Sequence, residues 1–382
     1  MRVLMFGWEF PPMNSGGLGT ACYGLTKGLS SLGVHVLMVL PRLPEDTSSG
    51  FLEFVDAHVH LLPVSSPLRG YMSFVQAGGS LHEEVLRYAA EAKKIALSSE
   101  FDVIHAHDWL TYLAGVEAKK VSGKPLVVHV HATEFDRTGG SQGHPFVSFV
   151  EKYGMEQADQ VITVSDLTRK KVIESYAIPS EKITVVHNAV SPIPLFSPLS
   201  SLPFEHVVLF LGRLTVQKGA DYFLRAAQKV LMYEPHTRFI LAGSGDMLDQ
   251  LHDMVYHLGL IDHVLFTGFL RGEALAHVYQ MASVYVMPSV SEPFGLTPLE
   301  ALQYGTPVII SKQSGVAEIL PHCLKVDFWD VDTLAEQILS VLRYAPLRQT
   351  LASEGGKLVA SLDWSQPAKQ CLTLYQEVLL HG

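Results

Sequence analysis

Short apolar runs alternate with longer amphipathic segments along almost the whole chain. The apolar runs are rich in Val, Ile and Leu, which is typical of strands buried on both faces of a parallel sheet. The segments between them repeat apolar residues at spacings of three and four, which indicates helices packed on those faces. The sequence therefore predicts an α/β fold built on parallel sheets.

The front half of the chain predicts a first sheet. Strands are expected at residues 3–6, 34–40, 102–107, 126–131, 161–165 and 183–187, and helices at 18–32, 81–98 and 110–121. A glycine-rich turn with Gly16, Gly17 and Gly19 joins the first strand to the first helix. Backbone amides in such a turn can contact a phosphate, although the G-G-x-G spacing is not the dinucleotide fingerprint.

A second sheet is predicted after a proline-rich segment at 191–204, whose composition marks a linker. Strands are expected at 207–212, 238–242, 264–268 and 284–287, and helices at 219–233, 246–258, 272–282, 297–303 and 334–342. We expect Asp330 to cap the last of these helices. The predicted domains are residues 1–193 and 203–363, followed by a C-terminal helix at 364–382.

Residues 283–311 form one strand–loop–helix–strand unit, and its loop carries candidate chemistry. Glu292 and Glu300 lie eight positions apart, and Gly295 leaves room for a ligand to approach the backbone. The run Thr297-Pro298-Leu299-Glu300 also fits a helix capping box, with Thr297 at the N-cap and Glu300 at N3. Glu300 is therefore either a cap or a ligand-binding residue, whereas no local helix needs Glu292.

Two cations, Arg213 and Lys218, follow the first strand of the second sheet. At the mouth of a strand-to-helix turn they are placed to neutralise a diphosphate, although such residues are often only a solvated rim. Gly243 lies in the next such turn.

Two pairs of histidines end neighbouring strands of the first sheet: His105 with His107, and His129 with His131. Alternate residues of a strand share a face, so each pair points one way. We expect His105 and His129 in the core, and His107 and His131 at the strand ends where chemistry belongs. No cysteine or carboxylate pattern completes a zinc site, so no metal is predicted.

The chain has 382 residues, a net charge of −10 and 17% charged residues, which argues against nucleic-acid binding. Its three cysteines have no metal-binding spacing and are expected to be free thiols in a reducing compartment. No apolar run is long enough to span a bilayer, and the start lacks a signal-peptide pattern. A cytoplasmic protein without an integral membrane segment is expected.

Four motifs together resemble a known family. The spacing EPFGLTPLE at 292–300 resembles the E-x7-E signature of the retaining, nucleotide-sugar-dependent glycosyltransferases of family 4, which have the GT-B fold. GRLTVQKG at 212–219 resembles their donor-phosphate clamp. WEFPP at 8–12 with GGLG at 16–19, and HATEFDRTGG at 131–140, are similar to glycogen and starch synthases. One position departs, because Asn14 stands where classical bacterial synthases carry lysine.

The resemblance implies two Rossmann-like domains facing a cleft, with the acceptor on the first and the donor on the second. The C-terminal helix would pack back onto the first domain. The catalytic residues that it implies are His131, Arg213, Lys218 and Glu292. The donor-binding residues are Gly16, Gly17, Gly243, Phe269, Leu270, Phe294, Gly295, Leu296, Thr297 and Glu300. The acceptor residues are Trp8, Glu9, His107, Asp108, Trp109 and Glu134.

The implied reaction is retaining transfer of glucose from ADP- or UDP-glucose to an α-glucan, without a metal or other cofactor. The expected partners are thus a nucleotide-diphosphate sugar and a carbohydrate acceptor. Trp8, Trp109 and Phe135 offer flat surfaces for sugar rings or else belong to the core. The alternatives are a family 4 enzyme acting on a small sugar or sugar phosphate, a nucleotide-sugar epimerase, and a catalytically silent nucleotide-sugar-binding subunit.

Overall fold

The computed structural model describes residues 1–11, 16–41, 53–56, 80–140, 143–193 and 204–381. Among these residues the chain divides into two compact units. The first unit holds the residues up to Ser191 together with those from Asp363 onward, and the second holds Pro192–Leu362. Most of the proline-rich segment, and Asn14, lie outside the described residues.

The first unit contains one seven-stranded sheet with the strand order β3-β2-β1-β4-β5-β6-β7. Every described pairing in it is parallel, as the sequence predicts. Its strands are β1 (Arg2–Phe6), β2 (His35–Leu40), β3 (Glu53–Asp56), β4 (Val103–His107), β5 (Leu126–Val130), β6 (Gln160–Thr163) and β7 (Ile183–Val185).

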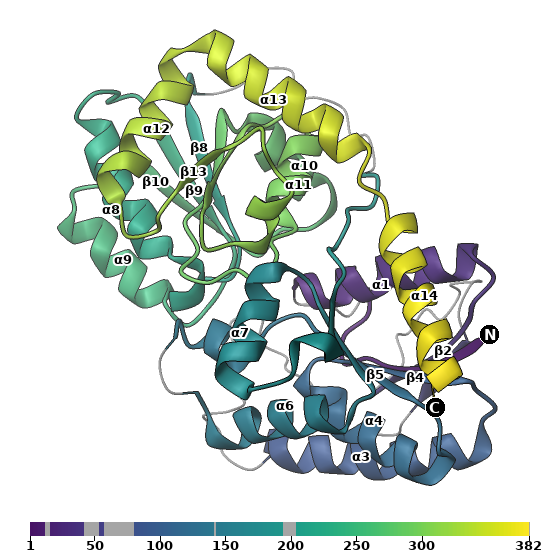
Figure 1. The fold of residues 1–382 in the computed structure, drawn as a ribbon. Helices are drawn as coiled ribbons and strands as arrows, with labels where there is room; N and C mark the ends of the chain where they lie inside the picture. The colour runs from purple at the N-terminus through teal and green to yellow at the C-terminus, as the bar shows by residue number, and fades with distance from the viewer. Residues whose placement is uncertain (12–15, 42–52, 57–79, 141–142, 194–203, 382) are drawn as a thin grey trace. The chain divides into compact units, whose positions relative to one another are not determined.

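Helices cover both faces of this sheet (Figure 1). On one face α3 packs against α4, and on the other α1 packs against α14, which comes from the end of the chain. The helices of the unit are α1 (Gly17–Ser31), α3 (Ser80–Ser98), α4 (Trp109–Ser122), α5 (Glu134–Arg137), α6 (Pro145–Gln157), α7 (Asp166–Tyr176), α14 (Ser365–His381) and the short 3-10 helix η1 (Ser180–Lys182).

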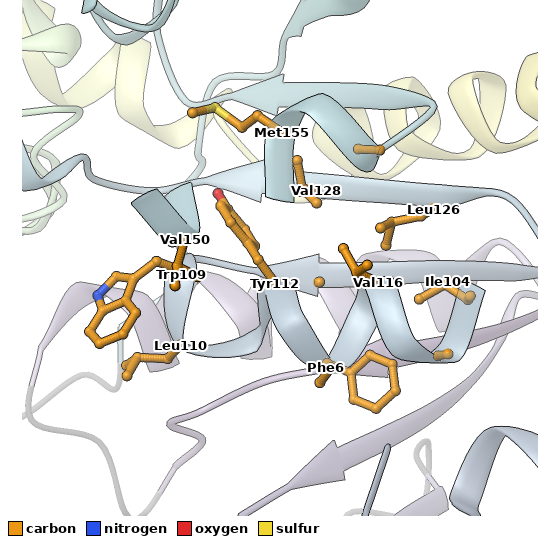
Figure 2. Packing of buried hydrophobic residues seen from close by; sticks show 14 of the residues in the cluster. Phe6, Ile104, Trp109, Leu110, Tyr112, Val116, Leu126, Val128, Val150 and Met155 are labelled. Carbon is orange, nitrogen blue, oxygen red and sulfur yellow. The ribbon is translucent and has the colours of Figure 1, made fainter. Parts of the chain in front are cut away.

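The alternation of strand residues separates two apolar clusters in this unit. Even-numbered residues of β1, β4 and β5, such as Ile104 and Val128, pack with Tyr112 and Val116 of α4, as Figure 2 shows. Odd-numbered residues of the same three strands, such as Val103, face α1 and α14 instead. The four histidines are also odd-numbered, so they belong to the face that α1 and α14 cover.

The second unit repeats the design with a six-stranded parallel sheet in the order β10-β9-β8-β11-β12-β13. Its strands are β8 (Val207–Leu211), β9 (Arg238–Ala242), β10 (Val264–Gly268), β11 (Val284–Met287), β12 (Val308–Ser311) and β13 (Leu324–Val326). Its helices are α8 (Ala220–Leu231), α9 (Leu248–His257), α10 (Gly272–Met281), α11 (Thr297–Gln303), α12 (Val331–Arg343) and α13 (Ala345–Ala360), with the 3-10 helices η2 (Val216–Lys218) and η3 (Gly315–Glu318).

Polar side chains set several of the element boundaries. Asp330 caps α12 by accepting a hydrogen bond from the Thr333 amide at 3.0 Å, which confirms the predicted cap. Ser165 caps α7 in the same way, accepting from the Thr168 amide at 3.0 Å. The strand predicted to reach residue 165 therefore ends earlier, at Thr163. No helix among the described residues combines the length and apolarity needed to cross a membrane.

Candidate active site

The turn between β8 and α8 carries Lys218 against Glu292. The ammonium of Lys218 donates to the Glu292 carboxylate, and both side chains are largely buried. Gly219 makes this approach possible: it has a φ of +69°, and a Cβ there would lie 2.1 Å from the Pro288 carbonyl oxygen. A side chain at this position would push the two loops apart. The Ser289 hydroxyl also donates to Glu292, at 3.3 Å.

Arg213 is joined to the same loop through a buried amide. Its guanidinium donates to Gln217 Oε1 at 3.2 Å, and Gln217 Nε2 donates to the Ser291 carbonyl at 3.0 Å. The Val290 amide returns a hydrogen bond to the Gln217 carbonyl at 2.9 Å. Gln217 thus fixes the turn that bears both cations to the loop that bears Glu292.

The neighbouring turn after β9 lies close against the first one. Gly243 has a φ of +144°, and a Cβ on it would stand 1.8 Å from the Gly212 carbonyl oxygen, so only glycine fits. Beyond β10, Phe269 is exposed and the Arg271 guanidinium lies 5.0 Å from its ring centroid, while Leu270 is half-buried. The turns after β8 and β9 lie at the carboxyl edge of the sheet, which is the usual ligand side of a parallel sheet.

The capping box, one of the two alternatives for residues 297–300, does not form. Leu296 is the N-cap of α11, without a side-chain cap, and Thr297 is already the first helical residue. The Thr297 hydroxyl lies 2.7 Å from the Tyr285 hydroxyl, and Glu300 accepts a hydrogen bond from the Tyr279 hydroxyl at 2.8 Å. The two buried tyrosines therefore hold the side chains that the cap would have used.

Burial raises the pKa of Glu300, and the hydrogen bond from Tyr279 opposes that rise. On the loop before the helix, Phe294 is buried and Gly295 has a φ of +103°, while Leu296 is half-buried. Glu300 thus stands as a carboxylate that no helix end requires.

In the first unit Asp108 joins the ends of β4 and β5. Its Oδ1 accepts hydrogen bonds from the His131 amide at 2.7 Å and the Ala132 amide at 3.2 Å. Its backbone has φ 58° and ψ 167°, a conformation that costs a residue other than glycine about 1–3 kcal/mol. Asp108, predicted as an acceptor residue, thereby positions the backbone of His131.

A buried charge cluster supports this strand end. Arg137 donates to Glu151 at 2.9 Å, to Asp108 Oδ2 at 3.4 Å and to the Ala132 carbonyl at 2.9 Å. Burial raises the pKa of Glu151 to about 7, although Arg137 and the Tyr176 hydroxyl lower it. Arg137 thus faces the buried carboxylates of Asp108 and Glu151.

The histidine stack consists of His105, His107, His129 and His131. Ring centroids lie 4.3 Å apart in the first pair and 4.2 Å in the second, which confirms that each pair shares a face. His105 and His129 are buried, as predicted. Between the pairs, His107 Nδ1 lies 2.9 Å from His131 Nε2.

Burial lowers the pKa of every imidazole in the histidine stack. Charge repulsion from neighbouring imidazoles lowers the pKa further for His105, which reaches about 3, and also for His107 and His129. The stack is therefore neutral near pH 7, so one ring nitrogen donates and the other accepts between His107 and His131.

The other residues predicted to bind the acceptor mostly make contacts that support the fold. Trp109 is 1% exposed and packs edge-on against Phe146, so the core alternative holds for it (Figure 2). Trp8 is half-buried, edge-on against Tyr88. Glu134 is buried and accepts a hydrogen bond from the His144 amide at 2.9 Å. Phe135 is half-buried against Tyr176, and Glu9 is half-buried.

Gly16 and Gly17 of the glycine-rich turn in the first unit are exposed to solvent. Gly16 is the N-cap of α1 and Gly17 its first residue. The structure thus brings Lys218, Arg213 and Glu292 together in the second unit. It brings His107, Asp108 and His131 together in the first.

The sequence prediction missed three contributors. Cys22 of α1 offers a thiol within 4.8 Å of ligand nitrogens of His107 and His131, a proximity that no cysteine pattern in the sequence indicates. Its place 85 positions before His107 gives no local signal, because only the packing of α1 brings it there. Gln217 and Arg137 lie inside motifs that the sequence singled out, but nothing in their spacing marks them as connectors.

Two family descriptions match the chain. Residues 15–192 match "Glycosyltransferase Family 4" and residues 201–357 match "Glycosyl transferases group 1". An uncharacterized glycosyltransferase of Methanocaldococcus jannaschii is 34% identical over 98% of both chains. A glycogen synthase of Mycobacterium tuberculosis is 28% identical over 98% of this chain and 94% of its own. The solved sucrose-phosphate synthase from Thermosynechococcus elongatus covers 100% of both chains, with a TM-score of 0.83 and 23% identity.

Proposed function

Because the chain belongs to glycosyltransferase family 4, we propose that it is a retaining enzyme that transfers glucose from ADP- or UDP-glucose to an α-glucan. Its fold is GT-B. In this proposal the second unit binds the nucleotide sugar and the first unit binds the acceptor. Similarity to a glycogen synthase over nearly the whole chain supports the acceptor class.

The observation that carries the proposal is the group of Arg213, Lys218 and Glu292 at one sheet edge. The bond from the sugar C1 to the diphosphate breaks in the reaction, and negative charge develops on the departing oxygen. Two fixed cations stabilise charge at that point, which is commonly the largest catalytic contribution. Lys218 donates to Glu292 in this structure, so in the proposal the diphosphate competes with Glu292 for this cation.

Retention is proposed to follow from attack on the face that the diphosphate leaves. The acceptor oxygen forms the new bond to C1, and its proton passes to the departing phosphate oxygen. His131, whose backbone Asp108 fixes, would lie near the transferred sugar. No protein carboxylate is assigned as a covalent nucleophile.

The test is a panel of ADP-, UDP- and GDP-sugars, each offered with maltooligosaccharides, monosaccharides and sugar phosphates, with nucleotide release as the readout. Labelled ADP- or UDP-glucose should lengthen maltooligosaccharides by successive glucose units. Single labelling of a monosaccharide or sugar phosphate alone would contradict the glucan acceptor and leave glycosyl transfer standing. Absence of nucleotide release from every donor–acceptor pair would contradict the proposed enzymatic activity itself.

Glu300→Gln is expected to weaken donor binding more than it slows chemistry, if the carboxylate holds the ribose hydroxyls. Its thermal unfolding should change little, because α11 has no side-chain cap and Gln can still accept the hydrogen bond from Tyr279. Donor Kd by calorimetry and the melting temperature on one variant separate the two roles. A fall in melting temperature with unchanged Kd would assign Glu300 a structural role only.

Exhaustive chelation is expected to leave the transfer rate intact, because Arg213 and Lys218 supply the positive charge that a metal would otherwise bring. The enzyme would be dialysed against EDTA and assayed in metal-free buffer. Activity that is lost in EDTA and restored by manganese would contradict the proposal that Arg213 and Lys218 alone supply the positive charge.

A further inference from the structure

Buried nitrogens without partners distinguish the histidine stack from an ordinary polar core. Among the described residues, His107 Nε2 and both nitrogens of His129 make no hydrogen bond, and these two residues are 0% and 2% exposed. Buried polar atoms are normally satisfied, so a ligand is one explanation for such a group. His105 shares this feature at its Nε2, whereas its Nδ1 lies 2.5 Å from the Tyr375 hydroxyl of α14.

Cys22 adds a soft donor to this group from α1. Its Sγ and one nitrogen each of His107 and His131 all lie within 4.8 Å of one another. Thiolate and imidazole together are the donors that Zn²⁺ prefers.

We propose that Cys22, His107 and His131 form a three-ligand site for one Zn²⁺ ion. Zinc–nitrogen bonds of about 2.0–2.1 Å at tetrahedral angles place two nitrogens roughly 3.3–3.4 Å apart. His107 Nδ1 and His131 Nε2 already lie 2.9 Å apart, so a small opening of that hydrogen bond would accommodate the ion. Binding releases the thiol proton of Cys22, and both imidazoles stay neutral.

The other histidine group is less suited to the ion. His105, His107 and His129 also have donor atoms within 4.8 Å of one another, but the ring of His105 is stacked on both of the others, with planes 27° and 7° apart. A ring nitrogen directs its lone pair in the plane of the ring, so stacked rings do not converge on one ion. This group has no thiol, and Tyr375 holds one nitrogen of His105.

The consequence for activity rests on the proposed function. Because the ion would bind the ring of His131, zinc added to the metal-free enzyme would inhibit glycosyl transfer, and chelation of that zinc would restore the metal-free rate. Cys22 has no role in the proposed reaction, so Cys22→Ser should transfer glucose at the wild-type rate and resist zinc.

The binding test needs no substrate and uses Co²⁺ alone as the spectroscopic probe. The full chain, freed of metal, is titrated with Co²⁺ and then with Zn²⁺. A thiolate-to-cobalt charge-transfer band with tetrahedral visible bands is expected at one ion per chain, and Zn²⁺ should displace it. Loss of an outer-shell partner alone costs about 10–100-fold in affinity. Cys22→Ser should therefore remove the band and raise the Zn²⁺ Kd at least about 100-fold.

The matched control is Cys323→Ser, which removes a half-buried thiol that belongs to neither histidine group. It should keep the band and the Zn²⁺ Kd. Near-ultraviolet circular dichroism and the melting temperature check that Cys22→Ser remains folded. The site is refuted by a wild-type chain without the band, by a band that survives Cys22→Ser, or by one that Cys323→Ser removes.

Discussion

Lys218→Ala should lower turnover by ~10²–10³, the scale found when one preorganised electrostatic donor is lost. The ammonium lies in a turn that Gly219 and Gln217 hold in place, so it needs little reorganisation as charge develops on the diphosphate. The interaction strengthens in the transition state, so kcat and kcat/KM should fall together. Steady-state kinetics with a saturating donor measures both.

The matched control is Lys229→Ala, in α8 of the same unit. This substitution removes the same charge from a lysine that pairs with the exposed Asp332. It should leave both kinetic constants unchanged, because a surface ion pair contributes little. Removal of Lys218 also leaves Glu292 without its cation. The melting temperature of the variant must therefore be measured and shown to lie above the assay temperature. Near-wild-type turnover of a folded Lys218→Ala protein would show that Lys218 does not stabilise the departing diphosphate.

Much of the second unit was predictable because its signals are local. Strands 238–242 and 264–268 were predicted at the bounds that the structure has. The turn at 213–219 and the loop at 288–296 each follow a buried strand of one parallel sheet, whose carboxyl ends must share an edge. Lys218 and Glu292 could therefore be placed near each other without a structure.

The missed parts depend on packing between distant segments. The capping box at 297–300 satisfied every local rule, yet Tyr279 and Tyr285 from two other elements hold its side chains. Trp109 follows a strand end, as a ligand-binding aromatic would, but α4 turns it into the core (Figure 2). Cys22 meets the histidine stack only because α1 covers that face of the sheet.

Arg137→Met should destabilise the protein by about 3–5 kcal/mol at pH 8, the cost of removing one partner from a buried ion pair. Methionine keeps much of the side-chain volume, so the lost charge and hydrogen bonds dominate. Arg137 is nearly buried and contacts Glu151 at 2.9 Å and Asp108 at 3.4 Å. Without it these carboxylates would be buried with no cation from this position.

The loss should shrink as the pH falls, and the sign follows from Glu151. Its pKa is raised to about 7 from an ordinary 4.5, so the folded protein binds this proton more tightly than the unfolded chain. Glu151 therefore costs stability progressively as the pH rises from about 4.5 to 7. Arg137 lowers this pKa, so Arg137→Met should raise it further and extend the loss above pH 7. At pH 5 the carboxyl is protonated in both proteins and needs no cation.

Urea unfolding at pH 5 and pH 8 measures the difference. The double variant Arg137→Met/Glu151→Gln should recover part of the stability at pH 8, because the buried charge is then absent. Lys152→Met, on the exposed side of α6, removes an equal charge and should change stability by less than about 0.5 kcal/mol at either pH. An Arg137→Met loss of equal size at both pH values would show that packing, and not the charge on Glu151, is what the arginine provides. The end of β5 would then be held mainly by Asp108 and its two backbone hydrogen bonds.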